Sequence, residues 1–384
     1  MKPLKGVRVL EMARILAGPW CGQILADLGA EVIKIERPGI GDDTRLWGPP
    51  FILDAKGESW GAAYFHATNR GKKSVCIDFT QPVGQSVLTA LASEADVLVE
   101  NFKVGDLKRH GLDYESLKRV NPRLIYASIT GFGQDGPYAK RAGYDFILQG
   151  MSGLMDITGE PDGQPQKVGV AVVDLFAGVY TSTAILAALH GRTATGVGAH
   201  IDMALFDVAT SMLANQGMNY LATGESPKRL GNAHPNIAPY QVFAVNDGFV
   251  IIAVGNDRQF QDLCDVLGAS TCANEPEFQT NASRVKSRAL LASTLNPYLL
   301  KWTRFDLLAA LEPRGVPAGP ISRIEDVFDD PQIIHRGMCS ELIGDDGVIV
   351  KSIASPIVID DVRQSSDRAS PKLGSSIARF TDPK

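Results

Sequence analysis

A chain of 384 residues is long enough for two domains, or for one large domain with a smaller domain inserted into it. With 45% hydrophobic and 21% charged residues it has the balance of a soluble globular protein, and its formal net charge of −5 provides no overall basic field to attract nucleic acid or an anionic membrane. We therefore expect no nucleic-acid or membrane partner, and an anionic ligand must meet a local cluster of Arg and Lys.

The first residues of the chain carry no targeting signal that we can identify. They show neither the long apolar core of a signal peptide nor the Arg- and Ser-rich pattern of a transit peptide. No apolar run approaches the roughly 20 residues that span a bilayer. The five cysteines are scattered and form no Cys/His ligand pattern, which favours a reducing compartment and argues against a zinc site. We expect a cytoplasmic protein without a bound metal.

Strand and helix signals alternate through the first half of the chain. Short apolar or alternating runs predict the strands Val7–Glu11, Glu31–Glu36, Ser74–Phe79, Val97–Glu100 and Leu124–Ile129. Apolar residues at helical spacing predict the helices Trp20–Leu28, Val83–Glu94 and Tyr114–Val120. Strands separated by helices of this length imply parallel βαβ units, so we expect an α/β fold whose parallel sheet is covered on both faces.

The second half of the chain no longer alternates strands and helices, which predicts a change of architecture. A long apolar helix over Val170–Leu189, a loop over Thr193–Gly198 and a second helix over His200–Asn215 come first. After Leu221 the chain becomes loop-rich, and Val242–Val254 then has the pattern of a β-hairpin. Prolines mark a second linker near residue 315. We expect a large domain over residues 1–224, a small domain over 225–315 and a return to the large domain over 316–384.

Asp174 is a lone carboxylate in the apolar stretch Gly169–Gly178. A charge there is costly to bury unless it is paired, hydrogen-bonded or functional. If a helix begins at this point, the side chain is an ordinary N-cap, and from the residues alone capping is favoured over catalysis. A partly desolvated carboxylate beside backbone N–H groups is also what a covalent acyl-transfer step requires.

Glycine-containing segments follow two of the predicted strands, at Leu16–Pro19 and Gly131–Gly133. An α/β sheet presents its ligand loops at such positions, but neither segment is a dinucleotide fingerprint or a P-loop. They indicate only that the backbone at these positions closely approaches a ligand or another part of the chain.

Cations occur near successive ends of the predicted strands. Each alone is more often a solvated charge than a ligand contact, but several together would form a local site for phosphates. They are Arg37, Arg45, Lys72, Lys73, Lys103 and Arg109. The six histidines show no triad or metal spacing; His234 lies in a polar linker, where it either faces a substrate or lies on the surface.

Six segments, in order along the chain, together resemble the class III CoA-transferase family, whose members include formyl-CoA transferase, carnitine CoA-transferase and α-methylacyl-CoA racemase. They are Leu10–Pro19, Gly29–Gly39, Glu100–Phe102, Ile129–Gln134, Asp174–Gly178 and Gly315–Ile321. Within the family the chain is similar to the succinyl-CoA:glutarate CoA-transferase branch. The strings that carry this second likeness are Gly41–Arg45, Trp47–Phe51, Arg141–Asp145, Ser152–Met155 and Pro239–Gln241.

The resemblance implies a fold and an assembly. In this family a Rossmann-like large domain is built from both ends of the chain, a smaller α+β domain is inserted between them, and two subunits interlock as a homodimer. The predicted boundaries near residues 225 and 315 fit that plan.

The resemblance also implies roles for single residues. Asp174 falls on the nucleophilic aspartate of the family, and Arg14 to Ala17 cover the early loop near the thioester. Arg14 and Leu16 replace the His and Gln of formyl-CoA transferase, which argues against formyl or oxalyl specificity. Lys73 and Lys103 are further candidates to contact the phosphates. Residues that fall on CoA-contacting positions of formyl-CoA transferase are Arg37, Ile77, Asn101, Phe102, Arg109, Tyr144 and Asp145.

The implied activity is transfer of CoA from an acyl-CoA, succinyl-CoA in this branch, to a free dicarboxylic acid. The implied path runs through a mixed anhydride and a CoA thioester of Asp174. The second carboxylate of the acceptor needs a cation, for which Arg14, Arg45 and His234 are the candidates. Two alternatives are an α-methylacyl-CoA racemase and a non-catalytic CoA-binding protein. Tyr144 disfavours the first, because it replaces the His of the racemases and a tyrosine with a pKa of about 10 is a poor base.

Overall fold

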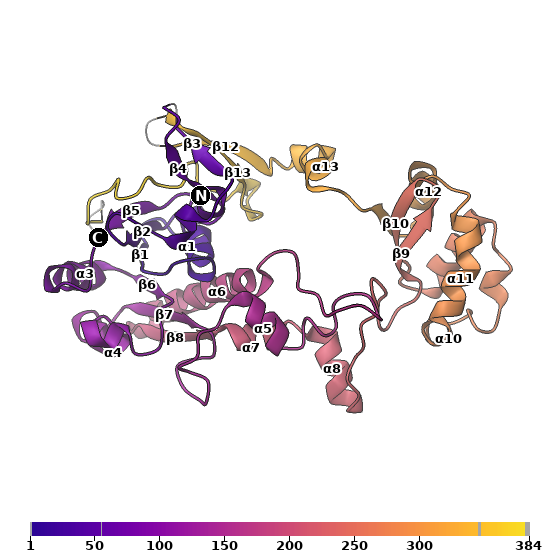
Figure 1. Cartoon of the computed structure of the whole chain (residues 1–384), viewed down its shortest axis with the longest axis horizontal. Helices are drawn as coiled ribbons and strands as arrows, with labels where there is room; N and C mark the ends of the chain where they lie inside the picture. Colours follow the sequence, from indigo (N-terminus) through magenta and orange to yellow (C-terminus); the bar gives the residue numbers. More distant parts are fainter. Residues whose placement is uncertain (1, 55, 345–346, 381–384) are drawn as a thin grey trace. The chain divides into compact units, whose positions relative to one another are not determined.

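The computed structural model of the protein describes residues 2–54, 56–344 and 347–380 (Figure 1). The chain divides into two compact units. The first comprises Met1–Ser152, Val168–Met212 and Pro331–Lys384, and the second comprises Gly153–Lys167 and Leu213–Asp330. The second unit thus extends beyond the expected interval 225–315 at both ends. Residues 1 and 381–384, the ends of the expected ranges 1–224 and 316–384, lie outside the described residues.

A six-stranded parallel sheet forms the centre of the first unit, which confirms the predicted α/β fold. Its strands are β1 (Arg8–Glu11), β2 (Glu31–Glu36), β5 (Lys73–Cys76), β6 (Val97–Glu100), β7 (Ile125–Thr130) and β8 (Ala199–Ala204). They lie in the order β5-β2-β1-β6-β7-β8, so the winding direction of the chain reverses between β1 and β6. In open α/β sheets the loops at the carboxyl ends on either side of such a reversal form a crevice for ligands.

Helices cover both faces of this sheet. On one face α1, α5, α6 and α7 enclose a core that includes Val9, Val97 and Ile125. On the other face α3 and α4 pack over Leu10, Ile33 and Leu98. Successive strand residues therefore point into opposite cores, as the two-residue period of a strand requires. The helices are α1 (Ala17–Asp27), α3 (Pro82–Glu94), α4 (Tyr114–Val120), α5 (Asp145–Met151), α6 (Val172–Thr195) and α7 (Leu205–Ser211).

The prediction of a helix over His200–Asn215 is wrong for its first part. Residues Ala199–Ala204 form the edge strand β8, paired in parallel with β7. Ile201 and Met203 pack against the core, whereas His200 and Asp202 are exposed. This alternation has the period of a strand and not of a helix. The loop predicted over Thr193–Gly198 also begins too early, because α6 continues to Thr195 and ends at Gly196 with a φ of 72°.

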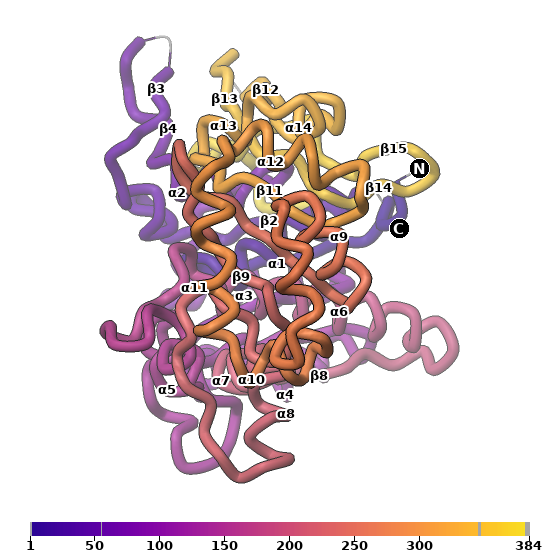
Figure 2. The backbone as a smooth tube through the Cα atoms, turned by 90° about the vertical axis from the view of Figure 1, so that its right-hand side faces the viewer, coloured from indigo at the N-terminus to yellow at the C-terminus, as the bar shows by residue number. Residues whose placement is uncertain are grey.

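Segments from the two ends of the chain pack together in the first unit (Figures 1 and 2). Trp60 of β4 packs with Leu342 and Val350, from the antiparallel pair β12–β13, and its indole donates to the carbonyl of Ser370 at 3.2 Å. The remaining elements of this unit are η1 (Asp43–Leu46), β3 (Phe51–Leu53), β4 (Ser59–Ala62), α2 (Ala63–His66), η2 (Leu107–His110), α14 (Pro331–His335), β12 (Cys339–Ile343), β13 (Ile349–Ile353), β14 (Val358–Ile359) and β15 (Val362–Arg363).

The second unit has its own apolar core, built on a three-stranded sheet in the order β11-β10-β9. The predicted hairpin is confirmed, with Val245 opposite Gly248 and the turn at Asn246 and Asp247. The elements are α8 (Ala214–Thr223), β9 (Tyr240–Val245), β10 (Gly248–Ala253), α9 (Asp257–Leu267), η3 (Cys272–Asn274), α10 (Asn281–Lys286), α11 (Arg288–Leu299), α12 (Arg304–Leu311), η4 (Glu312–Arg314), β11 (Ala318–Pro320) and α13 (Ile324–Phe328).

Helix α6 is long and apolar enough to cross a membrane by length and composition, contrary to the expectation of no such run. In this fold one side of it packs closely on α1. A Cβ on Gly178 would lie 2.8 Å from the carbonyl oxygen of Ala17 and 2.9 Å from the indole Cδ1 of Trp20. Gly178 is therefore needed for the close crossing of the two helices, which sets the position of Asp174 one turn earlier.

Candidate active site

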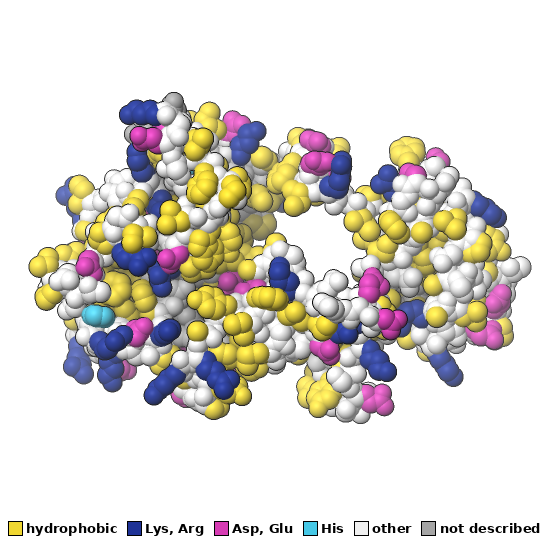
Figure 3. Space-filling view, in the orientation of Figure 1, with side chains coloured by type: hydrophobic (Ala, Val, Ile, Leu, Met, Phe, Trp, Pro, Cys, Tyr) yellow, Lys and Arg dark blue, Asp and Glu magenta, His cyan; other side chains and the backbone are white. Residues whose placement is uncertain are grey.

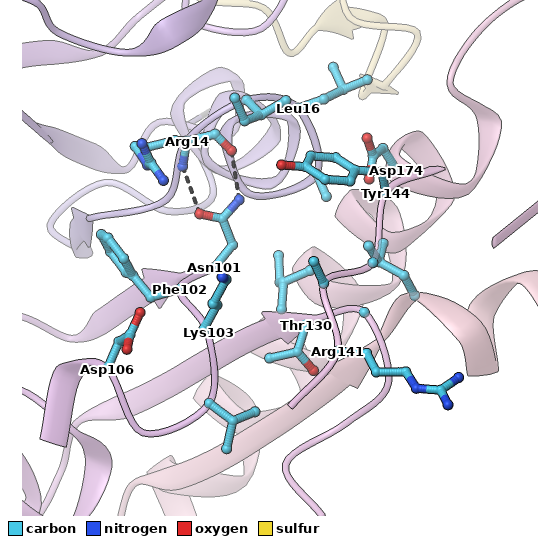
Figure 4. Close-up of a pocket in the computed structure, with 18 of the residues that line it drawn as sticks. Arg14, Leu16, Asn101, Phe102, Lys103, Asp106, Thr130, Arg141, Tyr144 and Asp174 are labelled. Atoms are coloured by element: carbon cyan, nitrogen blue, oxygen red, sulfur yellow. Dashed lines mark hydrogen bonds between the residues drawn. The ribbon is translucent and has the colours of Figure 1, made fainter. Parts of the chain in front are cut away.

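A cavity of about 600 Å³ opens at the carboxyl edge of the parallel sheet, beside the reversal between β1 and β6. The loop after β1, the loop after β6, the end of β7 and the first turn of α6 all contribute to its lining (Figure 4). The predicted site residues that line it are Arg14, Ala17, Asn101, Phe102, Lys103, Tyr144 and Asp174.

Asp174 lies at the third position of α6, with its partly buried carboxylate in the cavity lining. Burial, and then the negative charge of Asp145, raise the pKa of the Asp174 carboxyl to about 7. No hydrogen bond from the described part of the chain offsets this rise. The side chain is thus a carboxylate that is poorly solvated and poised to titrate near neutrality.

Asp145 caps α6, so the interpretation of Asp174 as an N-cap is wrong. The Oδ1 atom of Asp145 accepts hydrogen bonds from the backbone N–H groups of Val173 and Asp174, at 2.8 and 3.3 Å. Its Oδ2 atom accepts from the side-chain amide of Gln149 at 2.6 Å. Asp145, predicted as a CoA contact, is buried and is not among the residues that line the cavity. Because Asp145 satisfies the helix start, the carboxylate of Asp174 is left to face the cavity.

Asn101 joins the loops after β1 and β6. Its Oδ1 accepts from the backbone N–H of Arg14 at 2.9 Å, and its Nδ2 donates to the Arg14 carbonyl at 2.7 Å. Directly after this pair, Ile15 has a φ of 72° and α1 begins at Ala17. The first backbone N–H groups of an α-helix have no partner within the helix, so the start of α1 offers donors near the cavity.

Tyr144 reaches the cavity because two glycines allow the backbone to cross itself. A Cβ on Gly143 would lie 2.5 Å from the Cα of Gly131, and one on Gly131 would lie 2.7 Å from the Cα of Gly143. The glycine-containing segment after β7 therefore approaches another part of the same backbone. The ring of Tyr144, whose residue is 63% exposed, lies between the loop that carries Arg14 and the side chain of Asp174 (Figure 4).

Two predicted cations extend into or beside the cavity. Arg14 contacts Asp43 through Nη1 at 2.9 Å, and its guanidinium lies 5.6 Å from the ring centre of Phe102. Lys103 is exposed and extends toward the centre of the cavity (Figure 4). Arg141 also lines the cavity, although no role was predicted for it; its guanidinium lies 3.9 Å from the ring centre of Tyr138 and points away from Asp174 (Figure 4).

Three other predicted CoA contacts are not part of the cavity lining. Arg37 and Arg109 are exposed and form ion pairs with Asp43 and Asp106, at 3.4 and 2.5 Å, and both of these carboxylates do line the cavity. The two arginines therefore flank it. Ile77 is buried in the core beneath α3.

Arg45 and Lys73 are not brought to the cavity either. Arg45 is buried and donates to both carboxylate oxygens of Glu36, at 2.8 and 2.7 Å, which leaves it committed to an internal pair. Lys73 begins β5 and therefore lies at the amino edge of the sheet, where it contacts Glu31 at 2.5 Å. The sequence contains a signal for this position, because Lys73 directly precedes the predicted strand Ser74–Phe79 instead of following one.

His234 belongs to the second unit. There its Nδ1 accepts a hydrogen bond from the backbone N–H of Asn236 at 3.1 Å, and its ring lies 5.1 Å from that of Tyr240.

Basic side chains gather on the surface of the first unit near α4 and the loops before it (Figure 3). Lys108 and Arg109 in η2 and Lys118 and Arg119 in α4 are exposed there. This local positive surface contrasts with the formal net charge of −5. It is suited to attract a ligand that carries phosphates.

Comparisons of the sequence and of the structure with known proteins agree with one another. A sequence profile described as CoA-transferase family III matches residues 4–376. The succinate–glutarate CoA-transferase of Agrobacterium fabrum is 55% identical over 372 residues, covering 97% of this chain and 93% of the relative. The succinyl-CoA:glutarate CoA-transferase of Mus musculus is 43% identical, covering 89% of this chain and 77% of the relative. The crystal structure of a CAIB/BAIF family protein from Brucella suis is similar with a TM-score of 0.86 and 57% identity, over 97% of this chain and 96% of that one.

Proposed function

Because the chain belongs to CoA-transferase family III, we propose that this CoA-transferase moves CoA from succinyl-CoA to a dicarboxylic acid such as glutarate, with Asp174 as the nucleophile. The observation that supports this most strongly is the placement of Asp174, a poorly solvated carboxylate in a cavity at the strand-order reversal of the sheet. The names of the similar proteins support the choice of succinyl and glutaryl groups.

The proposed reaction begins with attack of an Asp174 carboxylate oxygen on the thioester carbonyl carbon. A C–O bond forms, the C–S bond breaks, and CoA leaves as a thiolate, giving a mixed anhydride. The thiolate then attacks the aspartyl carbonyl carbon, which releases succinate and leaves CoA as a thioester on Asp174. The acceptor carboxylate reverses these two steps: it displaces CoA to form a second anhydride, and the thiolate attacks the acceptor's carbonyl to regenerate Asp174.

The chain supplies orientation and charge stabilisation for these steps. Each nucleophile attacks as an anion, and the ionised form of Asp174 is accessible near neutral pH, so the chemistry requires no separate general base. Each tetrahedral intermediate places negative charge on an oxygen, which backbone N–H groups can stabilise. The start of α1, at Ala17, is the candidate source, because it lines the same cavity as Asp174. Poor solvation of Asp174 favours its attack, since little water must be removed from the carboxylate.

Arg14 is our candidate for the second carboxylate of the dicarboxylic acids. Its side chain is 41% exposed, lines the cavity and is paired with Asp43, which itself is 33% exposed. A ligand carboxylate can compete for a guanidinium that is paired at the surface, because such a pair is weak. Arg45, in contrast, would have to give up a buried pair with Glu36.

A panel of acceptors assayed with succinyl-CoA tests the proposed function. We expect transfer to glutarate and related dicarboxylates, and Arg14→Gln should raise the KM for dicarboxylates by about tenfold, the value of one charge-assisted contact. The KM for a monocarboxylate such as butyrate should change less. Absence of transfer to every acid in the panel would contradict the function, and equal effects on both acceptor classes would contradict the role of Arg14.

We also propose that the protein is a homodimer that functions in the cytoplasm. Apolar side chains of α6 are exposed on one side of the helix at Phe176, Val179 and Tyr180, and Met218 and Leu221 of α8 are 61% and 74% exposed. Surfaces of this kind are typical of subunit interfaces. All five cysteines are unpaired, which fits a reducing compartment.

Light scattering of the purified protein tests this assembly. We expect a mass twice the 41.2 kDa of one chain, and Val179→Glu should shift the population toward the monomer. A native protein that is monomeric would contradict the dimer, and one that is recovered only with membranes would contradict the cytoplasmic location.

A further inference from the structure

We propose that Asp42, held in place by Lys34, is a positioning residue for the reaction at Asp174, because it fixes the turn at Ile15 that aims the start of α1 at the cavity. This inference rests on the proposed function, since it assigns a role within that same site.

A cluster of four charged side chains contacts the turn between β1 and α1, and each of these side chains is completely buried. Lys34 contacts Glu11 at 3.0 Å and Asp42 at 2.9 Å, and Lys72 contacts the second oxygen of Glu11 at 2.8 Å. The side chains of Glu11, Lys34 and Lys72 have 0% exposure, as has that of Asp42. Two acids and two amines balance in charge, but a buried ionic cluster is rarely a gain in stability over an apolar one. Stability alone therefore does not explain why charged residues occupy these four positions.

Two members of the cluster form hydrogen bonds with the turn before α1. Lys34 donates to the carbonyl of Ala13 at 2.9 Å, and the backbone N–H of Ile15 lies 3.3 Å from each carboxylate oxygen of Asp42. Ile15, whose N–H is the second of these contacts, adopts a φ of 72°, a conformation that costs a β-branched residue on the order of 1–2 kcal/mol. Thr44 fixes Asp42 in turn, donating to Oδ1 from its N–H at 3.0 Å and from its hydroxyl at 2.8 Å.

The charge on Asp42 persists at working pH. Although burial opposes ionisation, Lys34 and the hydrogen bonds from Lys34 and Thr44 lower the pKa of Asp42 to about 2. Asp42 and Glu11 likewise raise the pKa of Lys34 against the effect of burial. The anchor of Ile15 is therefore an ion pair that does not switch off near neutral pH.

The turn matters for the chemistry because the next residues face the reaction. Leu16 and Ala17 line the cavity with Asp174, and α1 begins there. If Ile15 relaxes to an ordinary negative φ, the first N–H groups of α1 change direction. A displacement of about 1 Å in a positioning group can lower a rate by about 100-fold.

A second buried ion pair provides a matched control. Asp27 and Arg70 are 2% and 5% exposed, and Arg70 donates to both oxygens of Asp27, at 2.9 and 2.6 Å. Asp27 lies at the opposite end of α1 and does not line the cavity. Asp27→Asn therefore removes an equally buried aspartate charge without touching the turn at Ile15.

Asp42→Asn and Asp27→Asn are to be compared in the full-length protein with succinyl-CoA and glutarate. Both should melt at a lower temperature than the native protein. Only Asp42→Asn should lower kcat, by about 30-fold or more, with the KM for succinyl-CoA changed less than about threefold. Hydrogen exchange of residues 12–18 should accelerate in Asp42→Asn and not in Asp27→Asn. Equal kcat values for the two variants, or unchanged exchange at residues 12–18, would overturn the inference.

The same comparison of variants also covers two other outcomes, an Asp42→Asn protein that does not fold and a native protein that transfers no CoA. If Asp42→Asn does not fold, the milder Thr44→Val, which removes one bond to Asp42, should lower kcat about threefold without raising KM; an unchanged kcat overturns the inference. If the native protein transfers no CoA, the proposed function fails, and the hydrogen-exchange comparison alone decides whether Asp42 fixes the turn.

Discussion

Asp174→Asn is expected to lower kcat for CoA transfer by on the order of 10⁴-fold or more, because it removes the atom that forms the anhydride. The substitution keeps the size of the side chain and removes only its charge and nucleophilicity. The fold should remain, since Asp145 and not Asp174 provides the cap of α6. Steady-state turnover with succinyl-CoA measures the effect, and near-native turnover would reject Asp174 as the nucleophile.

The same substitution should make the protein more stable at pH 8. The pKa of Asp174 is raised from 3.8 to about 7 in the folded chain, so folding favours the protonated form. The native protein therefore loses stability as the pH rises from about 4 to about 7, by at most about 4 kcal/mol for a shift of this size. Asn does not titrate, so thermal melts should show a gain in Tm at pH 8 that is much smaller at pH 4. A lower Tm at pH 8 than the native protein would contradict this account.

The pH dependence of kcat/KM is the second large effect. Only the ionised carboxylate of Asp174 attacks the thioester, so kcat/KM should fall about tenfold for each pH unit below about 7, and about 100-fold by pH 5. Asp145→Asn should move this acidic limb to lower pH, because the negative charge of Asp145 contributes to the raised pKa. An acidic limb that begins only below pH 5 in the native enzyme would contradict the assignment.

Glu100 provides the control for the acidic limb. Its carboxyl is also buried, and burial raises its pKa to about 7. It accepts a hydrogen bond from the backbone N–H of Phe102 at 2.8 Å and does not line the cavity. Glu100→Gln should therefore leave the acidic limb near pH 7, whereas a shift of the limb in this variant would assign the titration to Glu100 instead of Asp174.

Much of the sheet could be predicted from the sequence because local patterns determine it. The strands Glu31–Glu36 and Val97–Glu100 and the helix Tyr114–Val120 have the bounds that their periodicity predicts. The edge strand β8 is not predicted, because its six residues lie directly before the helical pattern of α7 and are too few to separate from it by periodicity. Its pairing with β7 is a tertiary feature that no local pattern contains.

The candidate site was predicted less completely, because its geometry depends on partners far apart in the sequence. The sequence alone ranked Asp174 as a helix cap, since nothing local shows that Asp145, nearly 30 residues earlier, takes that role. Nothing in the sequence near Arg45 shows that its guanidinium pairs with Glu36 inside the fold. The hydrogen bond from the backbone N–H of Ile15 to Asp42 likewise joins two loops that follow different strands. No local pattern in the sequence predicts it.

Covalent trapping at Asp174 tests the central claim most directly. The native protein is incubated with succinyl-CoA and then with hydroxylamine, and peptide mass spectrometry locates the modified residue. We expect a hydroxamate on Asp174 that forms only when an acyl-CoA is present, because only the transfer mechanism activates that carboxyl group. A racemase or a non-catalytic CoA-binding protein would form no such adduct. CoA transfer without modification of Asp174, or with modification of a different residue, would contradict the account.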